Sequence, residues 1–573
     1  MNNLHRFFPF FSWFPLKRKA LRADLIAGVT VAMVLVPQSM AYAQLTGMPP
    51  YYGLYAAFLP VMIGAMWGSS HQLSTGPVAM VSLLTGSMLA SFAVPGTDQF
   101  IALAILLALM VGVMELALGL LRLGAIINFL SHPVIVGFTN AAAVIIALSQ
   151  LDKLLGVPAR RSGSFLADVW GLLSQAGDTH WLTLLVGIAA FAIMWLLRKY
   201  APRWPGVLIA VAVTTLASWQ IGFEKAGGAV VGVIPAGLPK LAIPQLNGET
   251  IMLLLSTAIV ITLVGFMEAI SVAKAMATKT RQRIDPNQEL LGQGLANVVG
   301  SFCQSFPVSG SFSRSAVNLA AGAVTGMSSV VTGVIVLATL LVFTSLLYHL
   351  PQSVLAAIIM MAVVNLVNLD AIRHIWKAQR HDGLAAATTF AATLVLAPHL
   401  DTGILIGAAL AIVLYLYRTM RPRVVVLGRH ADGTLSDATM HDLSTSKHVI
   451  AIRFDGSLYF ANVPYFEDAV LEQVARNPEA RYLLIVADGI NELDASGEEV
   501  IRHLVQRLRD SGVTLVFSGL KHQVLQVMER TGLREMVGTE NLFRTEDQAL
   551  EVIHSAIGAG KLPPEDFLLK PFR

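Results

Sequence analysis

Long apolar runs separated by short polar breaks fill the chain from residue 24 to about residue 418. Many of these runs have about 15 to 22 residues, which is the length that an α-helix needs to cross the hydrocarbon layer of a bilayer. We predict about fourteen spans, several of them short. They lie near residues 24–45, 53–69, 77–92, 100–121, 132–150, 181–199, 206–222, 251–273, 289–305, 313–323, 328–348, 353–368, 383–397 and 403–418. This pattern is typical of a polytopic α-helical membrane protein.

The pattern changes after the last span, where strand and helix periods alternate. In "KHVIAIRFDGSLYFANVPYFEDAVLEQVAR" we predict strands at Val449–Phe454 and Ser457–Phe460 around an Asp-Gly turn, then a helix at Val463–Ala475. "RYLLIVADG" and "VTLVFSG" are apolar runs, each followed by a helical stretch, so an α/β layer domain is expected. The predicted organisation is an N-terminal cytoplasmic or interfacial segment at 1–23, a transmembrane domain at 24–420, a linker at 421–446, the α/β domain at 447–560 and a C-terminal tail at 561–573.

The composition and the placement of charge agree with this division. Only 13% of the residues are charged, whereas a soluble protein carries about 25%. An aromatic, basic N-terminus without a cleavage-site pattern predicts an interfacial anchor, not a signal peptide. Lys and Arg follow spans 6, 8, 12 and 14, which places both termini and the α/β domain in the cytoplasm, at the cytoplasmic (inner) cell membrane. The net charge of +4 is small and its basic part lies in loops, which indicates membrane topology and no nucleic-acid partner. The apolar spans predict the lipid bilayer as the partner.

Two short segments occupy matching places, as span 3 and span 10, in two halves of seven spans each. "STGPVAMVSLL" (Ser74–Leu84) is expected to begin its helix near Pro77, and "PVSGSFSRSAVNLAAG" (Pro307–Gly322) near Ser311. Such a pair of short, Gly/Pro-interrupted segments indicates a transporter built from inverted repeats. A helix that starts in mid-membrane directs unpaired N–H groups and a partial positive charge at the bilayer centre. Two such helix ends that face each other would form an anion site.

The first span is interrupted in "VAMVLVPQSMAYAQLTGMPPYYGLY" (Val31–Tyr55). Pro37 could bend the helix, and Gln38 and Tyr42 lie four residues apart on one helical face. Two interpretations remain open at this point. The two polar side chains line the same cavity as the short helices, or Pro37 is a packing kink and Gln38 a hydrogen-bond partner for a neighbouring helix.

Three charged residues stand out in the predicted spans: Glu115 and Glu268 lie well inside theirs, and Arg314 lies at the start of span 10. A charge at this depth is costly and is a functional hypothesis by default. Arg314 would attract an anion and bond an oxyanion bidentately, and Glu268 could carry a proton. One alternative is a structural salt bridge between the two. The other is a switch, in which protonation of Glu268 releases Arg314 to hold the anion. Glu115 has no partner that spacing reveals, and we interpret it as a structural interhelical contact.

"DLIAGVTVAMVLVPQSMAYAQLTGMPPYYGLYAAFLP" (Asp24–Pro60) resembles the opening of the sulfate permease (SulP) anion transporters. The two short segments are similar to the third and tenth spans of that family, and the α/β domain resembles its STAS domain. The resemblance implies a seven-plus-seven inverted repeat with core and gate domains, usually a homodimer, and elevator-like alternating access. It implies substrate-binding positions on spans 1, 3 and 10 and a proton-coupling residue, Glu268, on span 8. The substrate-binding positions are Gln38, Tyr42, Gly76, Val78, Ala79, Ser311, Phe312, Ser313 and Arg314.

The coupling ion is predicted from two positions at which this chain differs from the sodium-dependent members of the family. Sodium-dependent bicarbonate members carry an Asp at the position of Glu268 and a Thr one helical turn later, where this chain has Val272. A valine offers no oxygen to a hard cation, so protons are favoured over sodium.

In the α/β domain, Ser496 follows Asp494 at the start of a helix. We interpret this motif as a helix cap, whereas the resemblance leaves phosphorylation of Ser496 open.

The predicted function is secondary active transport of a small anion, with sulfate first and bicarbonate or a C4-dicarboxylate as alternatives. An exchanger or passive channel of the same fold, and a membrane-anchored STAS sensor or scaffold, are the competing classes. No nucleophile–base pair, metal-ligand cluster or "GxxxxGK[ST]" loop occurs in the sequence. We therefore expect no enzyme activity, no cofactor and no bound metal.

Overall fold

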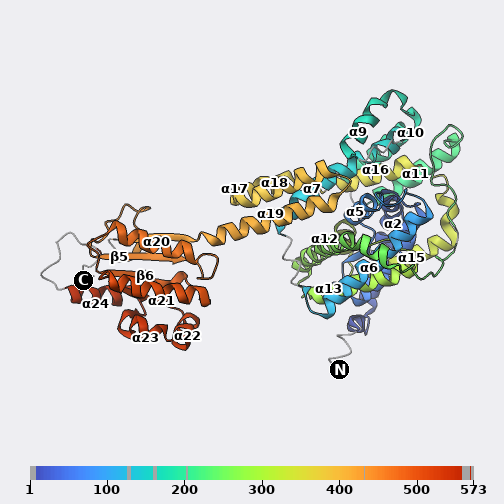
Figure 1. The fold of residues 1–573 in the computed structure, drawn as a ribbon. Coiled ribbons are helices and arrows are strands. Elements are labelled where there is room, and N and C mark those ends of the chain that lie inside the picture. The colour runs from blue at the N-terminus through green and yellow to red at the C-terminus, as the bar shows by residue number, and fades with distance from the viewer. Residues whose placement is uncertain are drawn as a thin grey trace. The chain divides into compact units, whose positions relative to one another are not determined.

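The computed structural model describes residues 8–124, 131–158, 164–201, 204–235, 237–364, 366–430, 433–557 and 568. The chain divides into two compact units, Met1–Ala411 and Ile412–Arg573, which are described separately below (Figure 1). Residues 1–7 of the expected N-terminal segment and most of the expected tail at 561–573 lie outside the described residues.

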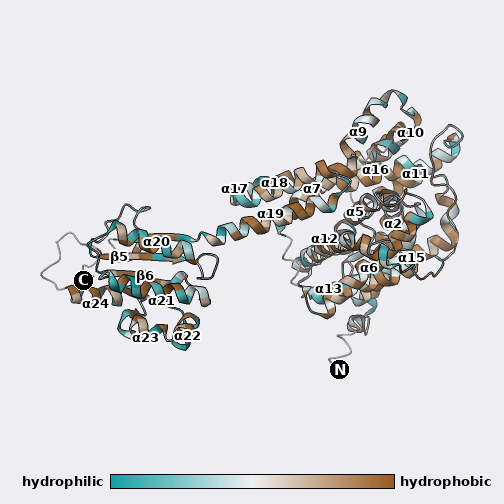
Figure 2. Cartoon of the chain, in the orientation of Figure 1, coloured by the Kyte–Doolittle hydropathy of each residue, from teal (hydrophilic) through white to brown (hydrophobic). Residues whose placement is uncertain are grey.

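The first unit is helical, and every predicted span corresponds to a helix. Among the described residues, seven helices are long and apolar enough to cross a membrane. They are α2 (Arg18–Thr46), α6 (Asp98–Leu120), α7 with α8 (His132–Leu148 and Leu151–Leu155), α10 (Trp181–Tyr200), α12 (Gly248–Thr280), α15 with the turns after it (Met327–Leu347) and α19 (Leu400–Met420). Figure 2 shows hydrophobic residues along most of these helices.

The remaining predicted spans are shorter helices. Span 2 is divided into α3 (Tyr51–Ala56) and α4 (Leu59–Trp67), and α2 starts at Arg18, inside the segment that was expected to precede it. The others are α5 (Ala79–Leu89), α11 (Gly206–Ile221), α13 (Pro286–Phe302), α14 (Phe312–Ala320), α16 (Gln352–Val363) and α18 (Arg380–Leu396). Two helices that were not predicted, α9 (Phe165–Ser174) and α17 (Leu369–Ala378), lie between spans.

The helices form two bundles, each built from both halves of the sequence. Helices α2 to α6 pack with α12 to α15, and helices α7 to α11 pack with α16 to α18. The bundles meet where α2 and α5 contact α7, α11 and α16. Since equivalent spans of each half join the same bundle, the arrangement is that of a seven-plus-seven repeat with a core bundle and a gate bundle.

A two-stranded sheet connects the two halves inside the core bundle. β1 (Ser74–Gly76) pairs antiparallel with β2 (Ser309–Ser311), with Ser74 opposite Ser311 and Gly76 opposite Ser309. The short helices follow directly, since α5 begins at Ala79 and α14 at Phe312. The two helix N-termini therefore leave from the two ends of one short ladder.

The second unit is a sheet covered by helices on both faces. Its six strands have the order β4-β3-β5-β6-β7-β8; β5 to β8 are parallel, and β3 is antiparallel to both neighbours. The strands are β3 (Arg423–Arg429), β4 (Leu435–Asp437), β5 (Val449–Asp455), β6 (Tyr482–Val486), β7 (Thr514–Ser518) and β8 (Leu542–Phe543). The helices are α20 (Val463–Arg476), α21 (Ala495–Asp510), α22 (His522–Thr531), α23 (Leu533–Val537) and α24 (Glu546–Ile557). The sheet has an apolar core on each face. Side chains of α20 to α23 pack into one of these cores, and side chains of α24 pack into the other.

Three sequence predictions for this unit were wrong in detail. Residues 421–446, expected as a linker, contain β3 and β4. The segment 457–460 is not a strand, because both edges of β5 are already paired, with β3 and with β6. The cap of α21 is Asp494, whose carboxylate accepts a hydrogen bond from the N–H of Gly497 at 2.8 Å, whereas Ser496 lies in the first helical turn.

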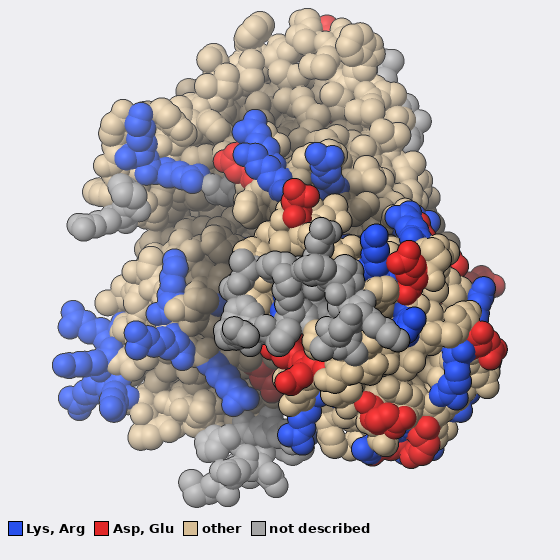
Figure 3. All heavy atoms as spheres, turned by 90° about the vertical axis from the view of Figure 1, so that its left-hand side faces the viewer, with Lys and Arg blue, Asp and Glu red and all other residues tan. Residues whose placement is uncertain are grey.

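Charged residues are unevenly distributed over the molecule. In Figure 3 the Lys, Arg, Asp and Glu side chains gather in separate groups, and broad areas of the same face carry none. This distribution matches the long uncharged stretches of the sequence, since an apolar surface is stable where lipid surrounds it.

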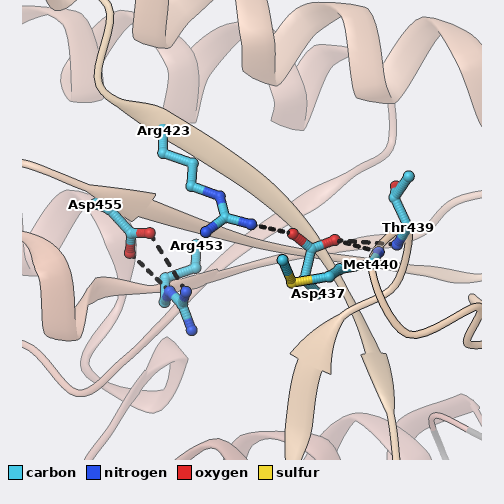
Figure 4. A network of polar contacts seen from close by, with 6 residues as sticks. All are labelled: Arg423, Asp437, Thr439, Met440, Arg453 and Asp455. Atoms are coloured by element: carbon cyan, nitrogen blue, oxygen red, sulfur yellow. Dashed lines mark hydrogen bonds and ion pairs between the residues drawn. The ribbon is translucent and has the colours of Figure 1, made fainter. Parts of the chain in front are cut away.

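Asp437 connects β4, at one edge of the sheet of the second unit, with the neighbouring strand β3 (Figure 4). It accepts hydrogen bonds from the backbone N–H groups of Met440 and Thr439, both at 3.0 Å, and pairs with Arg423 at 2.6 Å. The backbone hydrogen bond from Met440, followed by the contact with Arg423, holds the pKa of Asp437 below its ordinary value of 3.8. A second pair, Arg453 with Asp455 at 2.7 Å, lies nearby in the same view.

We expect Asp437→Asn to weaken the edge of this sheet at neutral pH but not in acid. A lowered carboxyl pKa stabilises the folded state above the unfolded pKa, and this contribution is lost as the pH falls through the folded pKa. Hydrogen exchange of the peptide spanning 435–443 should be faster in the variant at pH 7, and the difference should vanish well below pH 3.8. The exposed Asp510→Asn is the control. An equal difference at both pH values would contradict this account.

Candidate anion site

A buried arginine lies at the start of α14. The side chain of Arg314 is fully buried. Its Nη1 donates to the backbone oxygen of Pro77 at 2.8 Å and to Gln38 Oε1 at 3.3 Å, and its Nε donates to Ser74 Oγ at 3.4 Å. The guanidinium group therefore connects α14 with α2 and with the segment that leads into α5.

The remaining nitrogen of this guanidinium group, Nη2, is buried and has no hydrogen-bond partner among the described residues. It lies beside Gly76, where an added Cβ would be 3.2 Å from Nη2. Gly76 also has a φ of +148°, which favours glycine. A buried cationic donor without a partner is unusual in proteins. An anion oxygen next to Gly76 would satisfy it, with a charge-assisted hydrogen bond.

Gln38 and Tyr42 join this arrangement from α2. Gln38 Nε2 donates to Tyr42 Oη at 3.0 Å while its Oε1 accepts from Arg314, so the amide has one orientation. Both side chains are buried. Gln38 therefore makes a hydrogen bond to a neighbouring helix, as the second interpretation expected, and its partner there is the buried arginine on which the first interpretation depends. Helix α2 continues through Pro37 without a break.

The N-termini of the two short helices differ in their surroundings. The start of α14 is open: Phe312 is 58% exposed and Ser313 is exposed, while Ser311 Oγ lies 3.5 Å from the N–H of Arg314. The start of α5 is buried, at Val78 and Ala79, and no side chain caps it. The first N–H groups of a helix lack intrahelical partners and carry partial positive charge, so both ends favour an anion.

Glu268 lies on α12 of the same core bundle. Its Oε2 is buried and has no hydrogen-bond partner among the described residues, and the side chain as a whole is half-buried. No ion pair joins it to Arg314 in the described part of the chain, so the static salt bridge is not observed. The two charges still interact electrostatically over a longer distance. One turn later, Val272 packs in an apolar cluster with Leu73.

Sequence reasoning missed several polar side chains that hold this site. Asp24 is fully buried and accepts from Val324 N at 2.7 Å and from Thr325 Oγ1 at 2.6 Å, which fixes the segment after α14 to α2. Gln293 and Asn297 of α13 contact the segments of β1 and β2. Gln293 and Asn297 lie four residues apart on one helical face, a spacing signal that the sequence analysis did not use. Asp24 was part of a motif that had been singled out, but it was given no role.

Comparison with known proteins gives consistent matches over nearly the whole chain. The profile of the Sulfate permease family matches residues 21–389, and the profile of the STAS domain matches residues 441–549. The probable sulfate transporter 4.2 of Arabidopsis thaliana is 35% identical over 568 residues, which cover 95% of this chain and 83% of that protein. The high affinity sulfate transporter 2 of Stylosanthes hamata is 32% identical over 573 residues, covering 95% and 85%.

Solved structures show the same fold at lower identity. Murine Slc26a9, an anion transporter solved in the inward-facing state, has a TM-score of 0.89 at 23% identity, covering 97% of this chain and 95% of that chain. The transmembrane domain of the cyanobacterial bicarbonate transporter BicA has a TM-score of 0.59 at 24% identity, covering 69% and 98%. At these identities the comparison concerns the fold alone.

Proposed function

This chain belongs to the sulfate permease family, and from that premise we propose that it takes up an inorganic oxyanion, with sulfate as the first substrate, together with protons. Membership of this family supports the proposal that the chain transports anions across a membrane and is not an enzyme. The choice of sulfate follows its relatives, several of which are sulfate transporters. Bicarbonate and C4-dicarboxylates are the alternative substrates.

The observation that carries the proposal is Nη2 of Arg314, which has no hydrogen-bond partner among the described residues. This buried nitrogen lies beside Gly76, on a guanidinium group that starts from the first turn of α14 and contacts Pro77 just before α5. An oxyanion bound there would accept from the guanidinium group and from the helix ends without displacing a protein hydrogen bond. The proposed substrate-binding residues are those that the resemblance implied, from Gln38 and Tyr42 on α2 to Arg314 on α14.

Proton coupling is proposed through Glu268, whose buried Oε2 has no hydrogen-bond partner among the described residues. Loss of a proton would place a negative charge in the same core bundle as the proposed anion site, and uptake of a proton would remove it. Binding of the anion would then favour binding of the proton, and the reverse, which is the reciprocity that symport requires. Val272, in its apolar cluster, supports protons over sodium as the coupling ion.

Alternating access is proposed to occur by movement of the core bundle along the gate bundle. Polar contacts between the bundles are available to break and re-form during such a movement. Gln44 Nε2 on α2 donates to Gln352 Oε1 on α16 at 3.3 Å, and Lys153 Nζ on α8 donates to the backbone oxygen of Gln44 at 3.4 Å.

We also propose a homodimer in the cytoplasmic membrane, with the N-terminus and the STAS domain in the cytoplasm, following the positive-inside pattern.

Uptake of radiolabelled sulfate into proteoliposomes tests the proposal. With an inward proton gradient, we expect sulfate to accumulate above its external concentration, with or without sodium. Labelled bicarbonate and fumarate are compared under the same conditions. Accumulation of one of these anions in place of sulfate would identify that anion as the substrate and refute sulfate. Flux that only relaxes an anion gradient would overturn proton-coupled uptake and favour an exchanger or channel.

A further inference from the structure

Glu115 of α6 has a partner that its sequence context did not reveal. Its Oε2 accepts a hydrogen bond from Asn297 Nδ2 of α13 at 3.0 Å. Both residues are 1% exposed. Helices α6 and α13 are in close contact on either side of this hydrogen bond, because Gly112 and Gly294 lie at the interface. A Cβ added to Gly112 would be 2.6 Å from the backbone nitrogen of Val298, and one added to Gly294 would be 2.7 Å from that of Leu116.

A polar pair in such an interface is not needed for packing alone. Burying a carboxyl group is costly unless it is hydrogen-bonded, and apolar residues of similar volume often stabilise a buried position equally well. The interface already has the small residues that let membrane helices approach closely. The pair at Glu115 and Asn297 therefore calls for a role beyond holding the two helices together.

Asn297 uses the rest of its amide to hold the chain just before β2. Its Oδ1 accepts from the backbone N–H of Val308 at 2.8 Å, and its Nδ2 donates to the backbone oxygen of Val308 at 3.1 Å. The side chain thus pairs with both backbone groups of Val308, as a neighbouring strand would. One turn earlier on α13, Gln293 Nε2 donates to Thr75 Oγ1 of β1 at 2.8 Å. Helix α13 therefore holds both strands.

This pairing requires one orientation of the Asn297 amide. A flipped amide would direct its NH₂ group at the N–H of Val308 and its oxygen at the backbone oxygen of Val308, and both contacts would be repulsive. The NH₂ group of Asn297 has a third acceptor in the backbone oxygen of Gln293 at 3.2 Å, and Glu115 Oε2 is the one side-chain acceptor among the three. The carboxyl group thereby reinforces the orientation in which Asn297 holds Val308.

Val308 leads directly into the site. The next residue, Ser309, donates from its Oγ to the backbone oxygen of Gly265 at 2.6 Å, on the helix that carries Glu268. Ser311 then caps α14, and Arg314 follows in the first turn of that helix. A shift at Val308 would be transmitted both to the guanidinium group and to the contact with α12.

We propose that Glu115 is a positioning residue for the anion site: by orienting Asn297, it fixes β2 and the start of α14, and with them Arg314. This inference rests on the proposed function, in which Arg314 binds the transported anion.

Transport kinetics separate positioning from a purely structural role. We expect Glu115→Ala to raise the KM for sulfate by about tenfold, because a buried hydrogen bond in the supporting network is lost. Glu115→Gln retains an oxygen that accepts from Asn297, so it should restore most of the affinity. Leu107→Ala, at a fully buried position of the same helix, is the control. It should lower the thermal stability and leave the KM unchanged. A Glu115→Ala protein that loses thermal stability at an unchanged KM would overturn the proposal.

Hydrogen exchange gives a measurement that does not depend on transport. The peptide covering residues 303–312 of the purified full-length protein should exchange faster in Glu115→Ala than in the wild type and the control, since Val308 loses a fixed acceptor. Unchanged exchange would overturn the proposal. If Glu115→Ala is not recovered, Glu115→Leu fills the space and carries the same expectation. A wild-type protein that does not transport sulfate would refute the proposed substrate, while the exchange result would still decide the role of Glu115.

Discussion

Replacing Arg314 by glutamine is expected to lower sulfate uptake by about 100-fold or more. The substitution removes a fully buried cation, together with the unpartnered Nη2 beside Gly76. Hydrogen bonds to charged groups contribute about 1.5–3 kcal/mol each, and every 1.4 kcal/mol is about tenfold in affinity. The amide nitrogen of glutamine reaches about as far as Nε of arginine, so it can still donate to Ser74 Oγ, and part of the local packing should survive.

Two further variants make this test specific. Arg314→Lys keeps the charge but loses the planar fork, and we expect it to recover only a small part of the uptake. Arg373→Gln is the control, because Arg373 is exposed on α17 and pairs with the exposed Asp370 at 3.5 Å. Initial rates and the KM for labelled sulfate are measured in proteoliposomes. Wild-type uptake by Arg314→Gln would show that the anion binds elsewhere.

Glu268→Gln is expected to abolish proton-driven accumulation and to leave downhill exchange of sulfate in place. Glutamine resembles the protonated carboxyl group, so the anion site should stay available while the titrating group is lost. In the wild type, each unit of pH difference supplies about 1.4 kcal/mol per proton, or about tenfold accumulation. The variant should reach only the external sulfate concentration at any pH gradient.

The measurements are steady-state accumulation under an inward proton gradient and counterflow with sulfate on both sides. Glu249→Gln, at an exposed position in the first turn of the same helix, is the control and should accumulate sulfate like the wild type. Full accumulation by Glu268→Gln would exclude Glu268 as the coupling residue. Loss of counterflow as well would instead assign it a role in binding or in folding.

Local sequence predicted most helices of the membrane unit. Each predicted apolar run corresponds to a helix, because a bilayer requires long apolar helices, whereas α9 and α17 were not predicted and span 2 is divided into α3 and α4. The Gly and Pro residues around Gly76 and Ser309 predicted two interrupted helices, since these residues change backbone conformation wherever they occur. The positions of Gln38, Glu268 and Arg314 were evident because polar groups are rare at such depth.

Contacts between distant segments were decided by the tertiary structure alone. The pairing of Ser74 with Ser311, the place of β3 and β4 in the sheet, and the hydrogen bond between Glu115 and Asn297 each join residues that no local pattern relates. A strand forms where a partner offers a free edge, and a buried polar group is stable where another chain segment supplies its hydrogen bond. The sequence by itself therefore determined which segments are apolar enough for a membrane and which polar residues lie among them. Which of these residues meet, and which nitrogen of Arg314 is left without a hydrogen-bond partner among the described residues, depended on how the two halves of the chain pack.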